Sequence, residues 1–322
     1  MTGKTILVTG GTGTFGTAFC RRLLGTHPTP EKVIVLSRGW IAQQELRRNL
    51  GDPTCMRWFV GDVRDLARLR RAFNGVDYVI HAAALKDIVS AQYNPREAFL
   101  TNTYGTQNVI DAALDCGVEK VVFISSDKAV GASSCYGKTK ALAEELIVQG
   151  NAYAGRGPTR FCAVRYGNVI GSAGSVVEVF RSQAAIGRLT ITDKRMTRFW
   201  LPIGKGVDLV LTALESMIGG EIFVPKIPSM KVIDLAMALC PGCEQIEIGI
   251  RPGEKLHETL ISADESRDTL DRGNHYVICP NDPQWETDYV VISQRLRKIK
   301  DRLWEYRSDT NTQWISAEEL LK

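Results

Sequence analysis

The sequence feature that most constrains the fold is the stretch VTGGTGTFG at residues 8–16, which follows a short apolar run and opens an expected helix. Within it, Gly10, Gly13 and Gly16 are spaced as G-x-x-G-x-x-G. Residues without a Cβ let the backbone turn tightly and approach a pyrophosphate, which the amides at the helix N-terminus bind. A merely structural turn would not need three glycines in register, so the stretch predicts a dinucleotide-binding site.

Alternating strand and helix patterns surround this loop through the first half of the chain. Short runs rich in Val and Ile predict buried parallel strands at 5–10, 32–37, 56–62, 76–83, 119–125 and 159–167. Helical patterns lie between them at 14–25, 40–49, 65–73, 94–116 and 136–150. This alternation predicts an α/β fold with a doubly wound parallel sheet of the Rossmann type.

In the second half of the chain, strand and helix patterns alternate less regularly. Gly and Ser are frequent at 167–175, and Pro recurs from residue 202 onward. Helices are expected near 176–187, 204–218, 231–239 and 253–261. We expect a dinucleotide-binding domain at 1–167, to which 204–225 returns. The segments 168–203 and 226–322 should form a smaller C-terminal substrate-binding domain, and the tail from about residue 284 should pack back on the body.

Composition and charge argue against several other classes of protein. The 322 residues carry a net charge of only +4, spread along the chain, which does not indicate a nucleic-acid or membrane-surface partner. No apolar run approaches the roughly 18 to 20 residues that span a bilayer. The opening residues lack the apolar core and cleavage site of a signal peptide, so we expect a cytoplasmic protein.

The eight cysteines are scattered, and we expect most of them to be reduced, small hydrophobic residues. Cys240 and Cys243 have the C-x-x-C spacing of a redox pair or of half a zinc site. No second pair and no suitably spaced His accompany them. A turn after a helix is therefore the favoured interpretation, and no metal site is expected.

The ends of the next strands indicate which dinucleotide is bound. An Asp or Glu after the second strand would accept hydrogen bonds from the ribose of NAD, but this chain has Ser37 and Arg38. Because an Arg can pair with a 2′-phosphate, NADP is favoured over NAD, the alternative being that Arg38 is only a surface charge. The other expected cofactor contacts are Thr12, Thr14, Phe15, Asp62, Val63, Ala82, Ala83 and Ala84.

A Tyr and a Lys four residues apart, Tyr136 and Lys140, begin the helix after the fifth strand. This spacing puts both on one helix face, where they can also contact the cofactor. Free Tyr has a pKa of about 10, and a nearby ammonium favours the phenolate. With Ser125 or Ser126 orienting the substrate hydroxyl, the pair can take a proton from an alcohol while NADP accepts a hydride. On its own, such a pair would more often be an exposed helix pair.

Together these motifs resemble the extended short-chain dehydrogenase/reductase superfamily over nearly the whole chain. More narrowly, the chain resembles the inverting UDP-N-acetylglucosamine 4,6-dehydratases of pseudaminic acid and related sugar pathways. The resemblance implies a UDP-sugar substrate and a homo-oligomer. The stretches that carry it are TGGTGTFG, MRWFVGDVRD, YNPREAFLTNTYGTQNVIDAA, SSDKA, YGKTK, RYGNVIGSAGSVV, ITDKRMTRFW, GGEIFVPKIPSMK and IRPGEKLHE.

The resemblance also implies a use for Asp127 and Lys128, which precede Tyr136 by nine and eight residues. Oxidation of a hexose at C4 makes a ketone, which renders the neighbouring C5 proton acidic. Lys128 would remove that proton, and Asp127 would protonate the departing 6-hydroxyl. Hydride then returns to C6 and a proton to the opposite face of C5, which inverts that centre. Ser126 stands where the family usually has Thr and keeps the hydroxyl.

The nucleotide-sugar contacts implied by the resemblance come from several motifs. An Arg can grip a diphosphate through two parallel hydrogen bonds, although any one of these residues can instead serve in a structural salt bridge. The implied contacts are Lys86, Asn168, Ser175, Val176, Arg198, Arg251 and Glu254.

Two loops depart from the family's pattern. Asp87 replaces a His and a nearby Pro is lost, and Gly131 with Ala132 replaces an Asn-Pro. These changes bear on the sugar and the stereochemical outcome more than on the oxidation. Three alternatives stand beside the 4,6-dehydratase: a nucleotide-sugar 4-epimerase, which needs no acid–base pair at 127 and 128; a 5,6-dehydratase, which returns the hydride to C4; and a non-catalytic dinucleotide sensor, which should have lost Tyr136 or Lys140.

Overall fold

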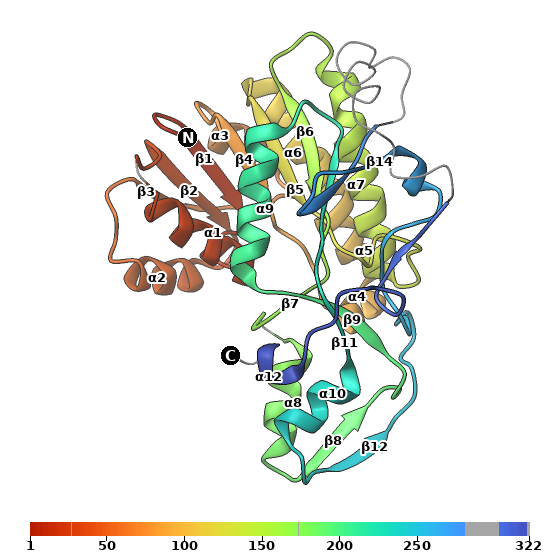
Figure 1. Cartoon of the computed structure of the whole chain (residues 1–322). Coiled ribbons are helices and arrows are strands. Elements are labelled where there is room, and N and C mark those ends of the chain that lie inside the picture. The colour runs from red at the N-terminus through yellow and green to blue at the C-terminus, as the bar shows by residue number, and fades with distance from the viewer. Residues whose placement is uncertain (27, 173, 281–302, 321–322) are drawn as a thin grey trace.

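The computed structural model describes residues 1–26, 28–172, 174–280 and 303–320. Within these ranges a nine-stranded sheet forms the larger body, in the order β14-β15-β10-β6-β5-β4-β1-β2-β3 (Figure 1). The strands from β3 to β10 in this order run parallel, and at the other edge β15 pairs antiparallel with both β10 and β14. The predicted doubly wound α/β fold is confirmed.

Both faces of the central strands are apolar, as a buried parallel sheet requires. In β1 (Thr5–Thr9), Ile6 and Val8 pack on one face and Leu7 packs on the other. The other strands of the sheet are β2 (Lys32–Ser37), β3 (Met56–Val60), β4 (Tyr78–His81), β5 (Lys120–Ile124), β6 (Arg160–Val164), β10 (Ile222–Pro225), β14 (Thr269–Asp271) and β15 (His275–Ile278).

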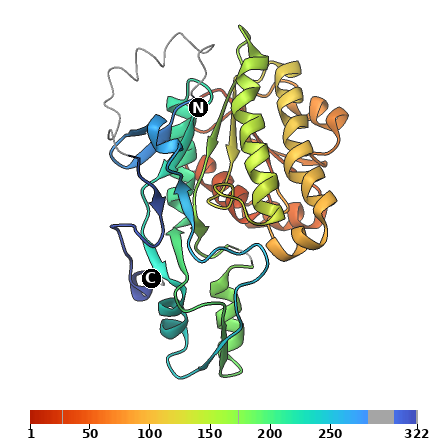
Figure 2. The ribbon, with the colours of Figure 1, turned by 90° about the vertical axis from the view of Figure 1, so that its right-hand side faces the viewer.

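Two helical layers cover the sheet, which Figure 2 shows nearly edge-on between them. One layer contains α1 (Thr14–Leu24), α2 (Trp40–Asn49) and α9 (Ile203–Ser216), whose apolar residues join the core on the Val8 side. The other contains α3 (Leu66–Phe73), α6 (Gly105–Cys116) and α7 (Cys135–Ala154), and packs on the Leu7 side. The short helices α4 (Ile88–Tyr93) and α5 (Pro95–Ala98) and a π-helical segment (Phe99–Tyr104) lead into α6. In the described parts of the chain no helix has the length and apolar character needed to cross a membrane.

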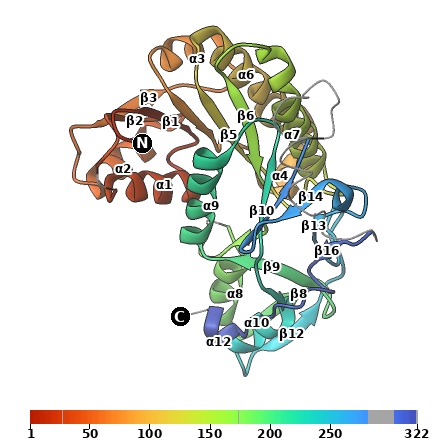
Figure 3. The same cartoon turned by 45° about the horizontal axis from the view of Figure 1, so that its top comes forward.

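A smaller lobe lies beyond the carboxyl ends of the parallel strands (Figures 1 and 3). It has its own core, in which Phe180, Leu189, Trp200 and Leu235 are buried. Its elements are β7 (Asn168–Val169), β8 (Arg188–Ile191), β9 (Thr197–Leu201), β11 (Ser229–Lys231), β12 (Glu244–Glu247), α8 (Val176–Ala184), α10 (Val232–Leu239) and α12 (Ala317–Leu320). A further pair of strands, β13 (Thr259–Ile261) and β16 (Tyr306–Arg307), is antiparallel.

The division of the chain between the two bodies differs in part from the expectation. Within 204–225, α9 covers the main sheet and β10 pairs with β6. However, β14 and β15 also belong to the main sheet, although 226–322 was assigned to the second domain. The reason is that β10 offers an edge on which β15 pairs antiparallel, with Ile222 opposite Ile278. The predicted tail lies partly outside the described residues; inside them, Trp314 forms a bridge with Ser229 of β11.

The helix predicted near 253–261 is wrong. Gly253 has a φ of +80°, and residues 259–261 form β13 instead. Distant partners satisfy the backbone here: the Glu258 amide donates to Ser308 Oγ at 2.9 Å, and the Ser308 amide donates to the Glu258 carbonyl at 2.9 Å. Tertiary hydrogen bonding therefore overrides the local helical pattern.

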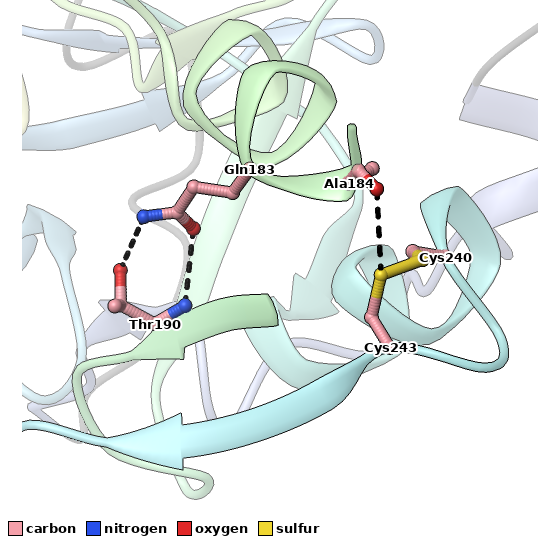
Figure 4. Close-up of a disulfide and its surroundings, with 5 residues drawn as sticks. All are labelled: Gln183, Ala184, Thr190, Cys240 and Cys243. Atoms are coloured by element: carbon pink, nitrogen blue, oxygen red, sulfur yellow. Dashed lines mark hydrogen bonds between the residues drawn. A yellow bond between two sulfur atoms is a disulfide. The ribbon is translucent and has the colours of Figure 1, made fainter. Parts of the chain in front are cut away.

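The structure also corrects the interpretation of the C-x-x-C motif. Cys240 and Cys243 do lie in a turn after α10, but they are joined by a disulfide, close to α8 (Figure 4). The turn brings their Cα atoms to 5.4 Å, within the distance that a disulfide can bridge. Cys20 and Cys162 are buried free thiols, as the apolar context of their segments predicts.

Candidate active site

A cavity of about 500 Å³ lies at the carboxyl ends of the parallel strands, where the strand order reverses between β1 and β4. Open α/β sheets bind their ligands at such a switch point. The glycine loop reaches this cavity through its main chain. A Cβ on Gly10, whose φ is +65°, would lie 2.8 Å from the Cα of Ala83, and a Cβ on Gly16 would lie 2.5 Å from the Cα of Gly11. Glycine is therefore required at both positions for the loop to pack this closely.

All residues predicted to contact the cofactor line this cavity, which brings together the glycine loop and the ends of β2, β3 and β4. At the β2 end, Gln43 Nε2 donates to Ser37 Oγ at 3.0 Å and to the Phe59 carbonyl at 2.9 Å. Burial would raise the pKa of Asp62, but hydrogen bonds from Arg64 hold it below its usual range. Among the described residues, no cluster of His, Cys, Asp or Glu could hold a metal ion.

The Tyr–Lys pair lies on the first turns of α7, whose N-terminus is capped by Ser134 Oγ accepting from the Gly137 amide at 3.0 Å. Lys140 Nζ donates to the Ile124 carbonyl and lies 3.7 Å from the centroid of the Phe123 ring. Burial lowers the pKa of Lys140 to about 7, and the charge of Glu144 opposes this only in part.

Tyr136 is buried, and burial raises the pKa of its phenol. The charge of Lys128 and a hydrogen bond with Ser126 act in the opposite direction. In the chain by itself, the ammonium that favours the Tyr136 phenolate is therefore that of Lys128.

The acid–base pair sits on the loop after β5. The Asp127 amide donates to the Tyr166 carbonyl at 3.1 Å, which extends the strand pairing and fixes the loop. Asp127 Oδ1 accepts from Ser126 Oγ at 2.9 Å and from Lys128 Nζ at 3.0 Å. Asp127 is fully buried and is not itself a lining residue, but both of these partners line the cavity. Its Oδ2 has no hydrogen-bond partner in the described part of the chain.

Burial and neighbouring charges act differently on the two members of this pair. Burial raises the pKa of Asp127, the charge of Lys128 lowers it, and the charge of Glu258 raises it, with an elevated pKa as the result. Burial alone would lower the pKa of Lys128, but the charges of Asp127 and Glu258 raise it above its ordinary value. An elevated carboxyl pKa suits a proton donor.

The segment 251–258 approaches the same loop from the other side. Lys255 Nζ donates to the Val130 carbonyl at 2.7 Å, and Ser133 Oγ donates to the Gly253 carbonyl at 2.8 Å. The carboxylate of Glu258, only 2% exposed, lies 3.3 Å from Lys128 Nζ and 3.1 Å from Lys255 Nζ. The acid–base pair is thus held by groups that are more than a hundred residues away in sequence.

Only some of the residues predicted to contact the nucleotide sugar lie at the cavity. Lys86 and Asn168 line the cavity. Asn168 Oδ1 and Ser175 Oγ are buried and make no hydrogen bond with any described residue, as expected for groups that a ligand would contact, but Ser175 does not itself line the cavity. Arg198 lies elsewhere: it is buried and donates to the carbonyls of residues 197, 255 and 256 at 2.7 to 3.1 Å.

The remaining three predicted contacts do not line the cavity either. Val176 is the first residue of α8. Arg251 is exposed in the turn before Gly253, where its amide donates to Glu254 Oε2 at 3.4 Å. Glu254 also lies 3.7 Å from Arg198, so the two form a weak ion pair.

Sequence reasoning missed several groups at the site. Thr101 and Tyr166 line the cavity, Gln43 holds Ser37, and Glu258 faces Lys128. Thr101 and Tyr166 lie within the stretches YNPREAFLTNTYGTQNVIDAA and RYGNVIGSAGSVV but were not singled out, and no motif marked Gln43. Glu258 does lie within the stretch IRPGEKLHE, but only its distance from Lys128 shows what it contacts.

A parallel sheet with a glycine loop, and a cavity that holds a Tyr–Lys pair on the following helix, define a protein of the extended short-chain dehydrogenase/reductase class. The chain belongs to the polysaccharide biosynthesis protein family, whose model matches residues 6–280. The resemblance inferred from the sequence is thereby confirmed.

Individual relatives carry more specific names. The chain is 47% identical to the inverting UDP-N-acetylglucosamine 4,6-dehydratase of Campylobacter jejuni, over 99% of this chain and 96% of the relative. It is 39% identical to a UDP-glucose 4-epimerase of Rickettsia felis, over 98% and 94% of the two chains. The solved structure of Pen from Bacillus thuringiensis is 35% identical, with a TM-score of 0.88 over 99% of this chain and 96% of that one.

Proposed function

We propose that this protein is a nucleotide-sugar 4,6-dehydratase that acts on UDP-N-acetylglucosamine and inverts C5. The observation that carries the proposal is that one cavity is lined by Tyr136, Lys140 and Lys128, and that Lys128 contacts the buried Asp127 at 3.0 Å. Oxidation at C4 uses the first pair alone, whereas expulsion of water also uses an acid and a base. The Campylobacter jejuni relatives named as inverting dehydratases support the same assignment.

Each member of the site has a role in this reaction. Tyr136 takes the proton of the 4-hydroxyl, which Ser126 orients. Lys128, once neutral, takes the C5 proton made acidic by the C4 ketone. Asp127 gives its proton to the oxygen leaving C6, so that water departs. Asn168 and Ser175 are the buried polar groups that supply contacts to the nucleotide sugar.

We also propose NADP as the cofactor. The glycine loop lines the cavity, where its backbone amides can bind a pyrophosphate, and Ser37 and Arg38 at the end of β2 line it as well, where they can bind a 2′-phosphate. Because Gln43 already donates to Ser37 Oγ, the Ser37 hydrogen remains to be donated to an anionic acceptor beside Arg38. Bound here, NADP would accept the hydride from C4 and return it to C6.

Arg38→Ala tests the choice of cofactor. Loss of a charge-assisted hydrogen bond should weaken NADP binding about 10- to 100-fold and leave NAD binding unchanged. Arg47→Ala, which removes an exposed Arg paired with Asp52, is the control and should change neither affinity in a calorimetric titration. Equal losses for both dinucleotides in Arg38→Ala would contradict the proposal.

The reaction itself is tested by incubation of the NADP-loaded protein with UDP-N-acetylglucosamine in D₂O. We expect the mass change of one lost water, a new C6 methyl signal by NMR and deuterium at C5. An unsaturated C5–C6 product would instead indicate a 5,6-dehydratase. A parallel panel of UDP-, CDP-, GDP- and dTDP-sugars identifies the nucleotide and sugar.

A second candidate function is 4-epimerisation, favoured by the relatives from Rickettsia named UDP-glucose 4-epimerase. The same incubation separates the two: an epimerase inverts C4, keeps the mass of the sugar and leaves the C6 hydroxymethyl group intact. That outcome would refute the dehydratase proposal.

A further inference from the structure

Among the described residues, Lys128 contacts a second carboxylate besides Asp127, that of Glu258, which lies 130 residues further along the chain. We propose that Glu258 is a positioning residue for dehydration: it holds the Lys128 ammonium beside Asp127 and sets the pH above which Lys128 acts as a base. The inference rests on the proposed function, since it assigns Lys128 the role of C5 base.

The geometry of Glu258 is that of a fixed group. Its side chain is 2% exposed, and two hydrogen bonds with Ser308 clamp its backbone. Oε1 lies 3.3 Å from Lys128 Nζ, and Oε2 lies 3.1 Å from Lys255 Nζ. Lys255 in turn donates to the carbonyls of Asp127 and Val130, at 3.3 and 2.7 Å. Glu258 is thereby tied both to the lysine and to the loop that carries it.

The charged groups around Lys128 belong to several different segments of the chain. Asp127 belongs to its own loop, and Glu258 and Lys255 belong to the segment after Gly253. Arg198 on β9 is 3.8 Å from the Glu258 carboxylate, and Glu254 is 3.7 Å from Arg198. Tyr136 faces the pair from α7.

Burial and these charges decide the state of Lys128. Burial and the Arg198 charge favour the neutral amine, whereas the two carboxylates favour the ammonium and prevail. Loss of one carboxylate should therefore shift the balance toward the amine.

The proton count shows why this balance matters. At rest, the Asp127 carboxylate and the Lys128 ammonium share one proton across 3.0 Å. The reactive pair is a carboxylic acid and an amine, so the proton moves from Nζ to Oδ1 without exchange with solvent. The amine then takes the C5 proton, the C–H electron pair forms the C5–C6 double bond, and the Asp127 proton leaves with the C6 oxygen as water. Glu258 stabilises the ammonium and therefore opposes this transfer. At low pH both groups carry a proton, and the Glu258 charge also raises the pH at which the pair gives up one of these two protons and becomes reactive.

Glu258→Gln removes the charge but keeps the shape. The acid limb of the dehydration rate against pH, where the pair gives up one of its two protons, should then move to lower pH by about one unit or more, because the Glu258 charge no longer raises the pKa of Asp127. Glu258→Asp keeps the charge, so the acid limb should stay at nearly the same pH as in the wild type, although the dehydration rate should be lower. Glu265→Gln is the control, since it removes a partly buried carboxylate that pairs with Arg165 and should leave the limb in place.

A second measurement does not depend on turnover. Competitive labelling of amines with acetic anhydride at a series of pH values, read by mass spectrometry of the Lys128 peptide, reports the titration of that lysine directly. Lys128 lines the cavity with 19% of its side chain exposed, so the reagent can reach it. Labelling in Glu258→Gln should begin at lower pH than in the wild type.

The outcomes separate the two proposals. An unchanged labelling curve in Glu258→Gln overturns the inference, whatever the substrate is. A shifted labelling curve in a protein that dehydrates no nucleotide sugar supports the effect of Glu258 on Lys128 and refutes the proposed function. If Glu258→Gln is unfolded and no longer binds NADP, Glu258→Asp is the deciding variant. An acid limb of the pH–rate profile and a Lys128 labelling curve like those of the wild type support the role of the Glu258 charge. A shift of either one overturns it.

Discussion

Lys140 is buried and Lys128 is mostly buried, and both line one cavity, yet their surroundings give them opposite properties. Lys140 contacts a carbonyl and an aromatic ring, and burial lowers its pKa to about 7. Burial acts on Lys128 in the same direction, but the carboxylates of Asp127 and Glu258 reverse the effect. Burial thus sets the same starting point for both lysines, and nearby charges decide the outcome.

The two surroundings also differ in where they come from. The Lys140 site is built from β5 and α7, both in the main body. The Lys128 site combines the loop after β5 with the distant segment 251–258 and with Arg198 of the smaller lobe. The redox part of the proposed reaction is therefore local in sequence, whereas the elimination part needs both bodies.

The largest expected effect separates the two lysines by function. Lys128→Met should reduce dehydration about 10³-fold because the C5 base is lost. Oxidation at C4 should remain, visible as NADPH absorbance in the first turnover, whereas Tyr136→Phe should abolish that signal as well. Lys138→Met, at an exposed position of the same helix, is the control. Dehydration at the wild-type rate in Lys128→Met would remove Lys128 from the mechanism.

A smaller effect is expected where the second body meets the acid–base loop. A Cβ on Gly253 would lie 2.8 Å from the Cβ of Ser134, at a φ of +80°. Gly253→Ala should cost about 1 to 3 kcal/mol locally and slow dehydration roughly 10-fold, with NADP affinity preserved. Gly249→Ala has a similar φ of +82° without any close neighbour, so it controls for backbone strain. Equal slowing in both variants would show that the contact with Ser134 is irrelevant.

The pH dependence of stability tests the Lys140 side. Its folded pKa of about 7 lies below the ordinary value of 10.5. Between these values the unfolded chain binds more protons, so Lys140 should make the free energy of unfolding rise with pH, by at most about 1.4 kcal/mol per unit. Urea denaturation of the cofactor-free protein from pH 6 to 10 should show this rise relative to Lys140→Met. Lys138→Met should retain it; identical curves for wild type and Lys140→Met would contradict the lowered pKa.

The smallest effect is expected far from either lysine. Cys240→Ser opens a very short disulfide loop beside α8, which should cost about 2 kcal/mol or less. Thermal unfolding measures that cost, and the dehydration rate and its pH profile should not change. A shift in the pH profile of dehydration would show that a change near α10 in the smaller lobe affects the protonation of Lys128.

The sequence predicted those site residues that belong to a short motif with a fixed spacing. The spacing of Gly10, Gly13 and Gly16 and of Tyr136 and Lys140 predicted residues that do line one cavity. Local pattern failed at 253–261, where hydrogen bonds with Ser308 replace the predicted helix. Nothing local could show that Glu258 lies 3.3 Å from Lys128 Nζ, because that contact exists only after the chain folds back.

Because segment 251–258 contacts the loop of Lys128, the site of Lys128 can be completed only late in synthesis of the chain. A chain emerges from the ribosome N-terminus first, and its domains fold as they appear. The glycine loop, Tyr136 and Lys140 therefore emerge well over a hundred residues before Lys255 and Glu258. The nascent chain therefore passes through a stage in which the residues of the dinucleotide cleft are present but Lys128 has only one of its two carboxylates.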